Sequence, residues 1–401
     1  MSRNYSIVGL VLLVFFVISL ITNILGPLIP EMIQTFSISL GLAGFIPFSF
    51  FLAYGVMSIP AGLLMERYRE KPVIAGAFAA ACAGSLAFAL VPAFRVGLAS
   101  LFLIGLGMAA LQVAINPLLR VAGGEQHFAF NSVLAQLIFG LASFISPQIY
   151  VYFVGDLQLP WISLYWLFAA VTLLMIVVVL AAPLPRVTLK DDERAGGWAT
   201  HVALLRRRYV WLYAIGIFCY VGFEQGVANW ISQFLQTYHG FDPRTVGANT
   251  VSGFWGLLTA GCVLGLVLLK LVDSRYVLMA AGAGAMLALS AALFGDARVA
   301  LIAFPLVGFC ASVMWSIIFA LALNSATEHH GSFSGLLCTA VVGGAVVPLL
   351  VGWGGDLVGL RQAMLLLYLP LAYIFAIGVW ARPVVTNATV TRKKDTQPVS
   401  S

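Results

Sequence analysis

The segment "PRVTLKDDERAGGWATHVALLRRR" (residues 185–208) is the one long polar stretch in this chain of 401 residues. It holds nine charged side chains, whereas only 9% of the whole chain is charged and 61% is hydrophobic. An ordinary soluble domain carries about 25% charged residues. With a mean hydropathy of +1.01, the chain has too little polar surface to face water. The composition therefore predicts a protein of the lipid bilayer, and the polar segment marks the place where the chain leaves it.

Six apolar runs precede the polar segment and six follow it, and each is long enough to cross about 30 Å of hydrocarbon. The predicted transmembrane helices are 6–34, 39–65, 72–93, 96–119, 129–154, 161–184, 209–238, 246–272, 276–294, 299–325, 332–354 and 362–381. The first run has no small-residue cleavage site, so we interpret it as a helix rather than a removed signal peptide. We expect an all-α membrane protein of twelve transmembrane helices. Its predicted organisation is an N-terminal six-helix bundle at 1–184, a cytoplasmic linker at 185–208, a C-terminal six-helix bundle at 209–382 and a cytoplasmic tail at 383–401.

The distribution of Lys and Arg predicts the orientation, because cytoplasmic loops carry an excess of basic residues. If both termini are cytoplasmic, 17 of the 21 Lys and Arg residues lie on the cytoplasmic side. The four on the outer side are Arg95, Arg244, Arg298 and Arg361. This asymmetry accounts for the net charge of +6 without a nucleic-acid partner. We expect a monomer in the cell (inner) membrane.

Matching features in the two halves indicate an internal repeat. Residues 105–112 read "GLGMAALQ" and residues 308–315 read "GFCASVMW"; in each, a glycine opens a small-residue stretch and a large side chain follows seven residues later. The next helix of each half runs into a proline, Pro147 or Pro348. Together with the six-plus-six count, these features fit a transporter of two pseudo-symmetric bundles with its binding site at the midplane between them.

The sequence offers no arrangement of catalytic residues. It contains no pair of acids within the membrane, no cluster of metal-ligand residues, no plausibly spaced Ser–His arrangement and no P-loop. The five cysteines lack metal-type spacing and are interpreted as reduced packing residues: Cys82, Cys219, Cys262, Cys310 and Cys338. We therefore expect no enzyme, no metal and no cofactor, and the energy source must be a gradient or the substrate itself.

Five motifs carry a family resemblance. They are "LQVAINPLLRVAG" (111–123), "FNSVLAQLIFGLASFISP" (130–147), "YVGFEQGVANW" (220–230), "SVMWSIIFALAL" (312–323) and "GSFSGLLCTAVVGGAVVPLLVGWGGD" (331–356). The chain resembles, along both halves, the sugar–proton symporters of the fucose, galactose and glucose type within the major facilitator superfamily. The resemblance implies the major facilitator fold and uptake of a monosaccharide by alternating access.

The departures from the family pattern concern proton coupling. Symporters of this family carry an aspartate in the first helix and a glutamate in the fourth, both tied to proton coupling. Alignment places Gly26 and Gln112 at those two positions. Phe139 replaces an asparagine of the fifth helix, and Cys262 replaces a basic residue of the eighth. Glu224 matches the glutamate of the seventh helix and is the only acid that we expect deep in the membrane.

The polar residues within the predicted helices suit a neutral polyol. Side-chain amides can bond hydroxyls in two directions, and flat rings cover the C–H faces of a pyranose. No Lys or Arg lies deep in any span, as an anionic substrate would require. The predicted substrate-binding residues are Asn23, Gln112, Asn116, Gln136, Gln225, Asn229, Trp255 and Trp315.

Each of these residues has a structural alternative. Buried amides often bridge helices, at about 0.6 kcal/mol per contact. Tryptophans often anchor a helix at the membrane surface, and we expect that role for Trp230. Gln112 and Gln136 match family positions, and Trp255 and Trp315 lie mid-span, so for these four we favour the binding site.

The expected function is secondary active transport of a neutral hexose or deoxyhexose, coupled to protons through Glu224. Burial disfavours the charged form of a carboxyl, so Glu224 can exchange a proton between the two sides. The alternatives are a passive or sodium-coupled sugar carrier, and a drug or metabolite exporter of the same superfamily. A sugar sensor that does not transport is a third possibility, and the absence of an extra domain argues against it.

Overall fold

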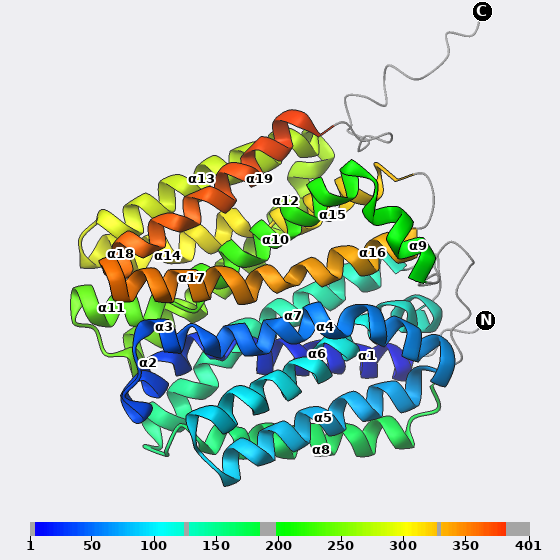
Figure 1. Cartoon of the computed structure of the whole chain (residues 1–401), viewed down its shortest axis with the longest axis horizontal. Helices are drawn as coiled ribbons and strands as arrows, with labels where there is room; N and C mark the ends of the chain where they lie inside the picture. The colour runs from blue at the N-terminus through cyan, green and yellow to red at the C-terminus, as the bar shows by residue number, and fades with distance from the viewer. Residues whose placement is uncertain (1–4, 124–127, 185–197, 327–329, 382–401) are drawn as a thin grey trace, which may run out of the picture.

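The computed structural model describes residues 5–123, 128–184, 198–326 and 330–381, almost all of them helical (Figure 1). The N-terminal half comprises α1 (Tyr5–Thr22), α2 (Leu25–Phe36), α3 (Leu40–Ala43), α4 (Phe45–Tyr68), α5 (Glu70–Leu90), α6 (Phe94–Gly123), α7 (Phe128–Tyr150), a π-helical turn (Val151–Asp156) and α8 (Ser163–Ala181). The C-terminal half begins with α9 (Trp198–Leu205), α10 (Arg208–Ala228), α11 (Ile231–His239), a π-helical turn (Pro243–Gly247), α12 (Ala248–Leu271) and α13 (Ser274–Phe294). It continues with α14 (Ala297–Ala311), α15 (Met314–Leu323), α16 (His330–Thr339), α17 (Gly343–Val358), α18 (Leu360–Ala363) and α19 (Tyr368–Trp380).

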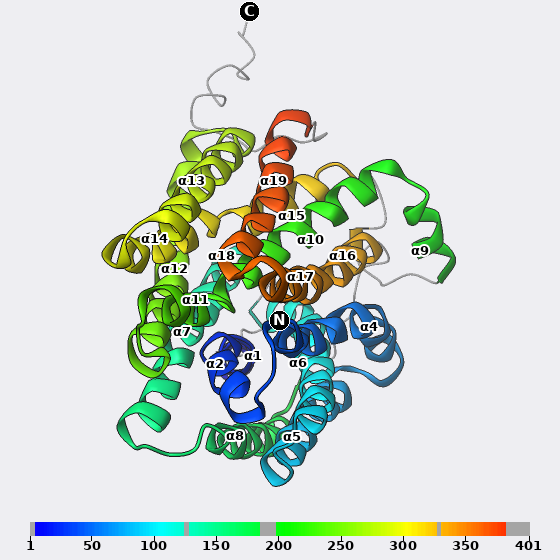
Figure 2. The same cartoon turned by 60° about the vertical axis from the view of Figure 1, so that its left-hand side comes forward.

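Twelve helical stretches within the described residues are long and apolar enough to cross a membrane, which confirms the predicted number. Because that number is even, Tyr5 and Ala381 lie at the same end of the molecule, here called the terminal end (right in Figure 1). The opposite end, with α3, α11 and α18, is here called the distal end. Figure 1 shows the two halves as two bundles that lie side by side and meet along a seam. At the seam, α7 packs against α12, and α4 packs against α17 (Figure 2).

The repeated glycines position equivalent helices in the two bundles. A Cβ atom at Gly105 in α6 would collide with the carbonyl oxygen of Phe50 in α4. A Cβ atom at Gly308 in α14 would collide in the same way with the carbonyl oxygen of Phe254 in α12. Each glycine therefore allows the fourth span of its half to approach the second span at backbone distance. The predicted internal repeat has a packing reason at these two positions.

Two spans that were predicted as unbroken helices are interrupted at equivalent places. The first span breaks between α1 and α2 next to Asn23, and the seventh breaks between α10 and α11 next to Asn229. In both, the asparagine side chain bonds back to the residue four positions earlier, Ser19 or Gln225. Hydropathy does not reveal these breaks, because apolar residues surround both asparagines. Interrupted helices near the middle of a bilayer are tolerated where neighbouring groups satisfy the freed backbone, and they often line binding sites.

The predicted linker contains a helix that its polar composition did not indicate. Helix α9 (Trp198–Leu205) buries His201 and Leu204, and it packs against α16 and α10. Residues 185–197 and the predicted tail at 383–401 lie outside the described residues.

Candidate functional site

A carboxylate and an aromatic wall come together at the middle of the C-terminal half. Glu224 in α10 is half-buried, and the Tyr220 hydroxyl one turn earlier donates a 2.6 Å hydrogen bond to its Oε1. The Tyr220 ring lies 6.1 Å from the ring of Trp315 in α15, which stacks on Phe319 at 5.7 Å. In the described part of the chain, no Lys, Arg or His forms an ion pair with Glu224. The cluster therefore offers one acceptor without a fixed cation beside flat apolar surface.

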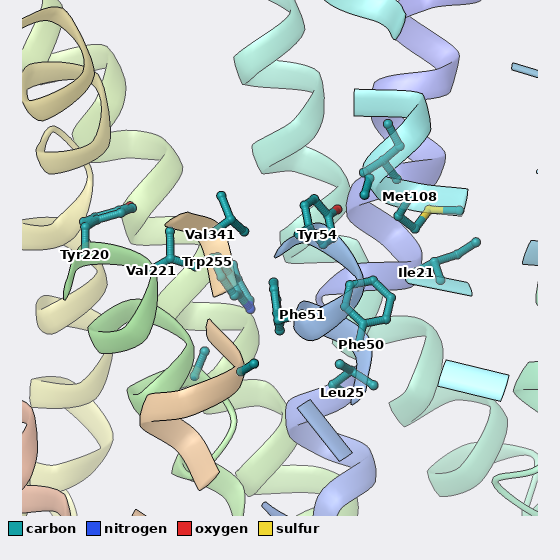
Figure 3. Packing of buried hydrophobic residues seen from close by; sticks show 14 of the residues in the cluster. Ile21, Leu25, Phe50, Phe51, Tyr54, Met108, Tyr220, Val221, Trp255 and Val341 are labelled. Atoms are coloured by element: carbon teal, nitrogen blue, oxygen red, sulfur yellow. The ribbon is translucent and has the colours of Figure 1, made fainter. Parts of the chain in front are cut away.

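A second tryptophan on the same half has an unused donor. Trp255 in α12 is 4% exposed, and its indole Nε1 has no hydrogen-bond partner among the described residues. Figure 3 shows Trp255 with Tyr220 on one side of the seam, facing Phe51 and Tyr54 of α4 on the other. Leaving a buried N–H unpaired costs about 1–3 kcal/mol, so the position is suited to a ligand that supplies an acceptor.

The face of α7 that carries Gln136 is turned toward α12. The residues that follow at helical spacing on this face all meet α12: a Cβ atom at Gly140 would collide with Thr259, Phe144 accepts a hydrogen bond through its carbonyl oxygen, and Gln148 donates to Asn249 at 2.8 Å. Gln136 itself is exposed. It is thus an exposed amide on the face of α7 that borders the seam.

The remaining N-terminal amides are placed differently. Gln112 is half-buried in α6, the helix that also carries the repeated glycine Gly105. Asn116 lies in α6, and its side chain is outside those that the structure describes. Asn23 is 4% exposed and donates to Ser19 and to Ser143 of α7, at 3.2 and 2.9 Å. These bonds join α1 to α7 within one half, so Asn23 acts here as a contact between helices.

Gln225 and Asn229 are also occupied by contacts within their own helix. They are 4% and 2% exposed, and the Asn229 amide donates to both the backbone oxygen and the side-chain oxygen of Gln225. Their predicted contact with a substrate stays a prediction. The structure places Glu224 and Trp315 on either side of Tyr220, and it places Asn23 and this amide pair in helix packing.

The prediction that Trp230 anchors its helix at the membrane surface is wrong. Trp230 is fully buried, and its indole donates a 3.1 Å hydrogen bond to the carbonyl oxygen of Pro348 in α17. Pro348 lies inside α17, so this bond ties Trp230 to the backbone of a neighbouring helix. Trp230 therefore has a packing role within the C-terminal half.

A buried acid near the end of the first span was not predicted from the sequence. Glu31 near the end of the first span is 4% exposed and receives Arg244 Nε at 2.6 Å and Nη2 at 3.2 Å. The Tyr150 hydroxyl donates to the same Oε1 at 2.9 Å. Glu224 is therefore not the only acid in the interior. The signal in the sequence was a single acid inside the apolar run 6–34, but its partner is 213 residues away.

The halves also meet through backbone beside the two helix breaks and at the distal end. A Cβ atom at Gly26, the position where family symporters carry an aspartate, would lie 2.6 Å from the carbonyl oxygen of Ala228 in α10. Asp356 of α17 accepts hydrogen bonds from the backbone N–H groups of Leu40 and Gly41, at 2.9 and 2.8 Å. An aspartate at position 26 could not fit while the distal ends are in this contact.

Comparison with known proteins agrees with this architecture. Residues 11–346 match the model of the Major Facilitator Superfamily. The glucose/galactose transporter of Brucella abortus biovar 1 (strain 9-941) is 29% identical over 397 residues, which cover 94% of this chain and 95% of that protein. The L-fucose-proton symporter of Escherichia coli (strain K12) is 26% identical over 420 residues, covering 96% and 95%. The crystal structure of the transporter FucP in the outward conformation superposes with a TM-score of 0.68 at 22% identity, covering 94% and 98%. The chain belongs to the major facilitator superfamily.

Proposed function

We propose that this protein is a secondary active transporter that takes up a neutral hexose or deoxyhexose, coupled to protons through Glu224. The observation that carries the proposal is the cluster of Glu224, Tyr220 and Trp315 beside the seam. Relatives that match more than nine-tenths of the chain are named as transporters of glucose, galactose and L-fucose, and none of those named is an enzyme.

The chemistry of the cluster supports a sugar as the substrate. Trp315 with Phe319 presents a stacked ring face that can cover the C–H groups of a pyranose. The unpaired indole N–H of Trp255 can donate to a hydroxyl, and the exposed amide of Gln136 can both donate and accept. Gln112 and Asn116 complete the proposed lining from α6, and Asn23, Gln225 and Asn229 hold the interrupted helices beside it.

Glu224 is suited to couple a proton because it has a hydrogen-bond donor but no cationic partner in the part of the chain that the structure describes. Glu224 can therefore bind or release a proton according to the pH on the side of the membrane to which the site is open. Alternating access then proceeds as the bundles at 1–184 and 209–382 move against each other around the central site. The excess of basic residues at the terminal end favours a cytoplasmic position for both termini and makes the distal end the outer one.

The test is uptake of a panel of labelled hexoses and deoxyhexoses into proteoliposomes with the purified protein. An inward proton gradient should drive at least one of these sugars above equilibrium. If only a sodium gradient drives uptake, the coupling ion is sodium rather than the proton. If the sugar only equilibrates across the membrane, the protein is a passive carrier. If no sugar of the panel is transported, the proposal is contradicted, and export of another metabolite is the remaining alternative.

A further inference from the structure

The distal end holds an ion pair, between a buried acid and an exposed arginine, that the central site does not use. Glu31 belongs to α2 in the N-terminal half, and Arg244 belongs to the turn before α12 in the C-terminal half. The pair therefore crosses the seam. Its two hydrogen bonds, at 2.6 and 3.2 Å, join each carboxylate oxygen to a different guanidinium nitrogen. Such paired, charge-assisted bonds are among the stronger polar contacts in proteins.

The two partners of the pair are unequally fixed. The Glu31 side chain is 5% exposed and keeps a bond from Tyr150, which belongs to its own half. The Arg244 side chain is 44% exposed and borders a cavity of about 400 Å³ that is lined by residues of both halves, among them Gln34, Gln158 and Gln236. When the halves part, water can therefore hydrate the guanidinium of Arg244, while the bond from Tyr150 keeps the carboxylate of Glu31 oriented.

A second carboxylate forms hydrogen bonds across the seam, and this one belongs to the C-terminal half. Asp356 of the C-terminal half accepts two bonds from the N-terminal half, at the backbone N–H groups of Leu40 and Gly41. Close backbone contact surrounds it, because a Cβ atom at Gly352 would lie 2.5 Å from the carbonyl oxygen of Leu40. Asp356 is exposed, so water competes for its bonds more readily than for those of the buried Glu31.

We propose that the Glu31–Arg244 pair is the principal lock of the distal gate, with Asp356 as a weaker second tie and Tyr150 as the residue that positions the lock. The inference rests on the proposed alternating access, because only a protein whose halves part at this end needs such a lock. A contact made in one state alone shifts the equilibrium between states by its own free energy. Breaking the lock therefore raises the population that is open at the distal end.

The lock can be tested without any substrate. Spin labels at Leu157 and Thr237, which are exposed at the distal end on opposite halves, report the separation of the halves in a variant without the native cysteines. Glu31→Gln retains the bond from Tyr150 but loses the ion pair. We expect it to increase the ratio of distally open to distally closed molecules by about tenfold, visible as a longer distance between the labels.

Three further variants make the result decisive. Arg244→Gln changes an exposed residue, so it should fold normally and lengthen the distance as Glu31→Gln does. The double variant should add little to either single change, because both remove the same contact. Asp296→Asn is the matched control: this distal acid caps α14 of its own half through Val299 N–H and should leave the distance unchanged.

Unchanged label distances in both Glu31→Gln and Arg244→Gln would overturn the lock, whatever the transported substrate is. Equal lengthening in Asp296→Asn would show that any lost distal acid loosens this end, and it would also overturn the assignment. A transport assay without activity on sugars would contradict the proposed function and leave the measured distances untouched, so the two failures are distinguishable.

Discussion

The seam between the two halves differs between its distal end and its middle. At the distal end, each half supplies partners for the other. Glu31 accepts hydrogen bonds from Arg244, and Asp356 accepts them from two backbone N–H groups of α3. In the middle, Glu224 bonds within its own half, to Tyr220. The indole N–H of Trp255 has no partner there among the described residues.

This difference separates two tasks. Complementary charges and close backbone contact make the distal seam able to close by itself. In the middle, a carboxylate, an indole donor and an amide are left for a third participant, which is what a binding site between two moving halves needs.

Glu224→Gln should abolish accumulation of sugar that is driven by an imposed proton gradient. Glutamine keeps the size and a hydrogen-bond acceptor for Tyr220 but cannot bind and release a proton. Exchange of labelled for unlabelled sugar at equal pH should continue, because it needs no net proton movement. Accumulation that survives the substitution would place the coupling step elsewhere, and loss of exchange as well would indicate a structural role.

Gly26→Ala should hold the distal seam apart. Its methyl group would meet the carbonyl oxygen of Ala228 at 2.6 Å, and forced contacts of this kind cost about 1–3 kcal/mol. Because about 1.4 kcal/mol is a factor of ten, we expect uptake to fall about tenfold or more. Gly76→Ala is the control, since a Cβ atom at that position meets nothing within 4 Å. Similar losses in both variants would point to helix packing in general rather than to the gate.

Gln136→Ala and Trp315→Ala should each weaken sugar binding about tenfold. The first removes a hydrogen bond to a hydroxyl, worth about 1–3 kcal/mol when the hydroxyl is left unpaired. The second removes the ring that stacks on Phe319. Calorimetry on the purified variants measures both effects. Trp166→Ala, on a 48% exposed tryptophan of α8, should bind sugar as the unaltered protein does; an equal loss there would remove Trp315 from the site.

Asn23→Ala should have the smallest effect on binding and a measurable effect on stability. Its amide bonds Ser19 and Ser143, and contacts of this kind within a membrane are worth about 1 kcal/mol. We expect a lower melting temperature and a sugar affinity within about twofold of the original, since no bond to the substrate is lost. A loss of affinity as large as that of Gln136→Ala would return Asn23 to the substrate-binding residues.

Most of the architecture was predictable because the membrane requires local patterns. A span needs an unbroken apolar run, so the twelve spans could be recognised from neighbouring residues, and the repeat of Gly105 and Gly308 from the sequence around each glycine. The breaks at Asn23 and Asn229 were not predicted, since apolar side chains continue through both. The burial of Trp230 was missed for a related reason, because its acceptor at Pro348 is 118 residues away.

The residue pattern is enough to establish that the chain spans a membrane, how many times it does so and which polar side chains its spans contain. Hydropathy and loop charge act over about 20 neighbouring residues, so each can be recognised without the fold. Which polar groups pair with one another depends on how the fold brings distant spans together. Glu31 and Arg244 meet because two distant spans end at the same face, whereas Glu224 faces no cation in the described chain. The role of a buried charge depends on what the fold places within a few ångströms of it, because the cost of leaving it unpaired is large in the membrane interior.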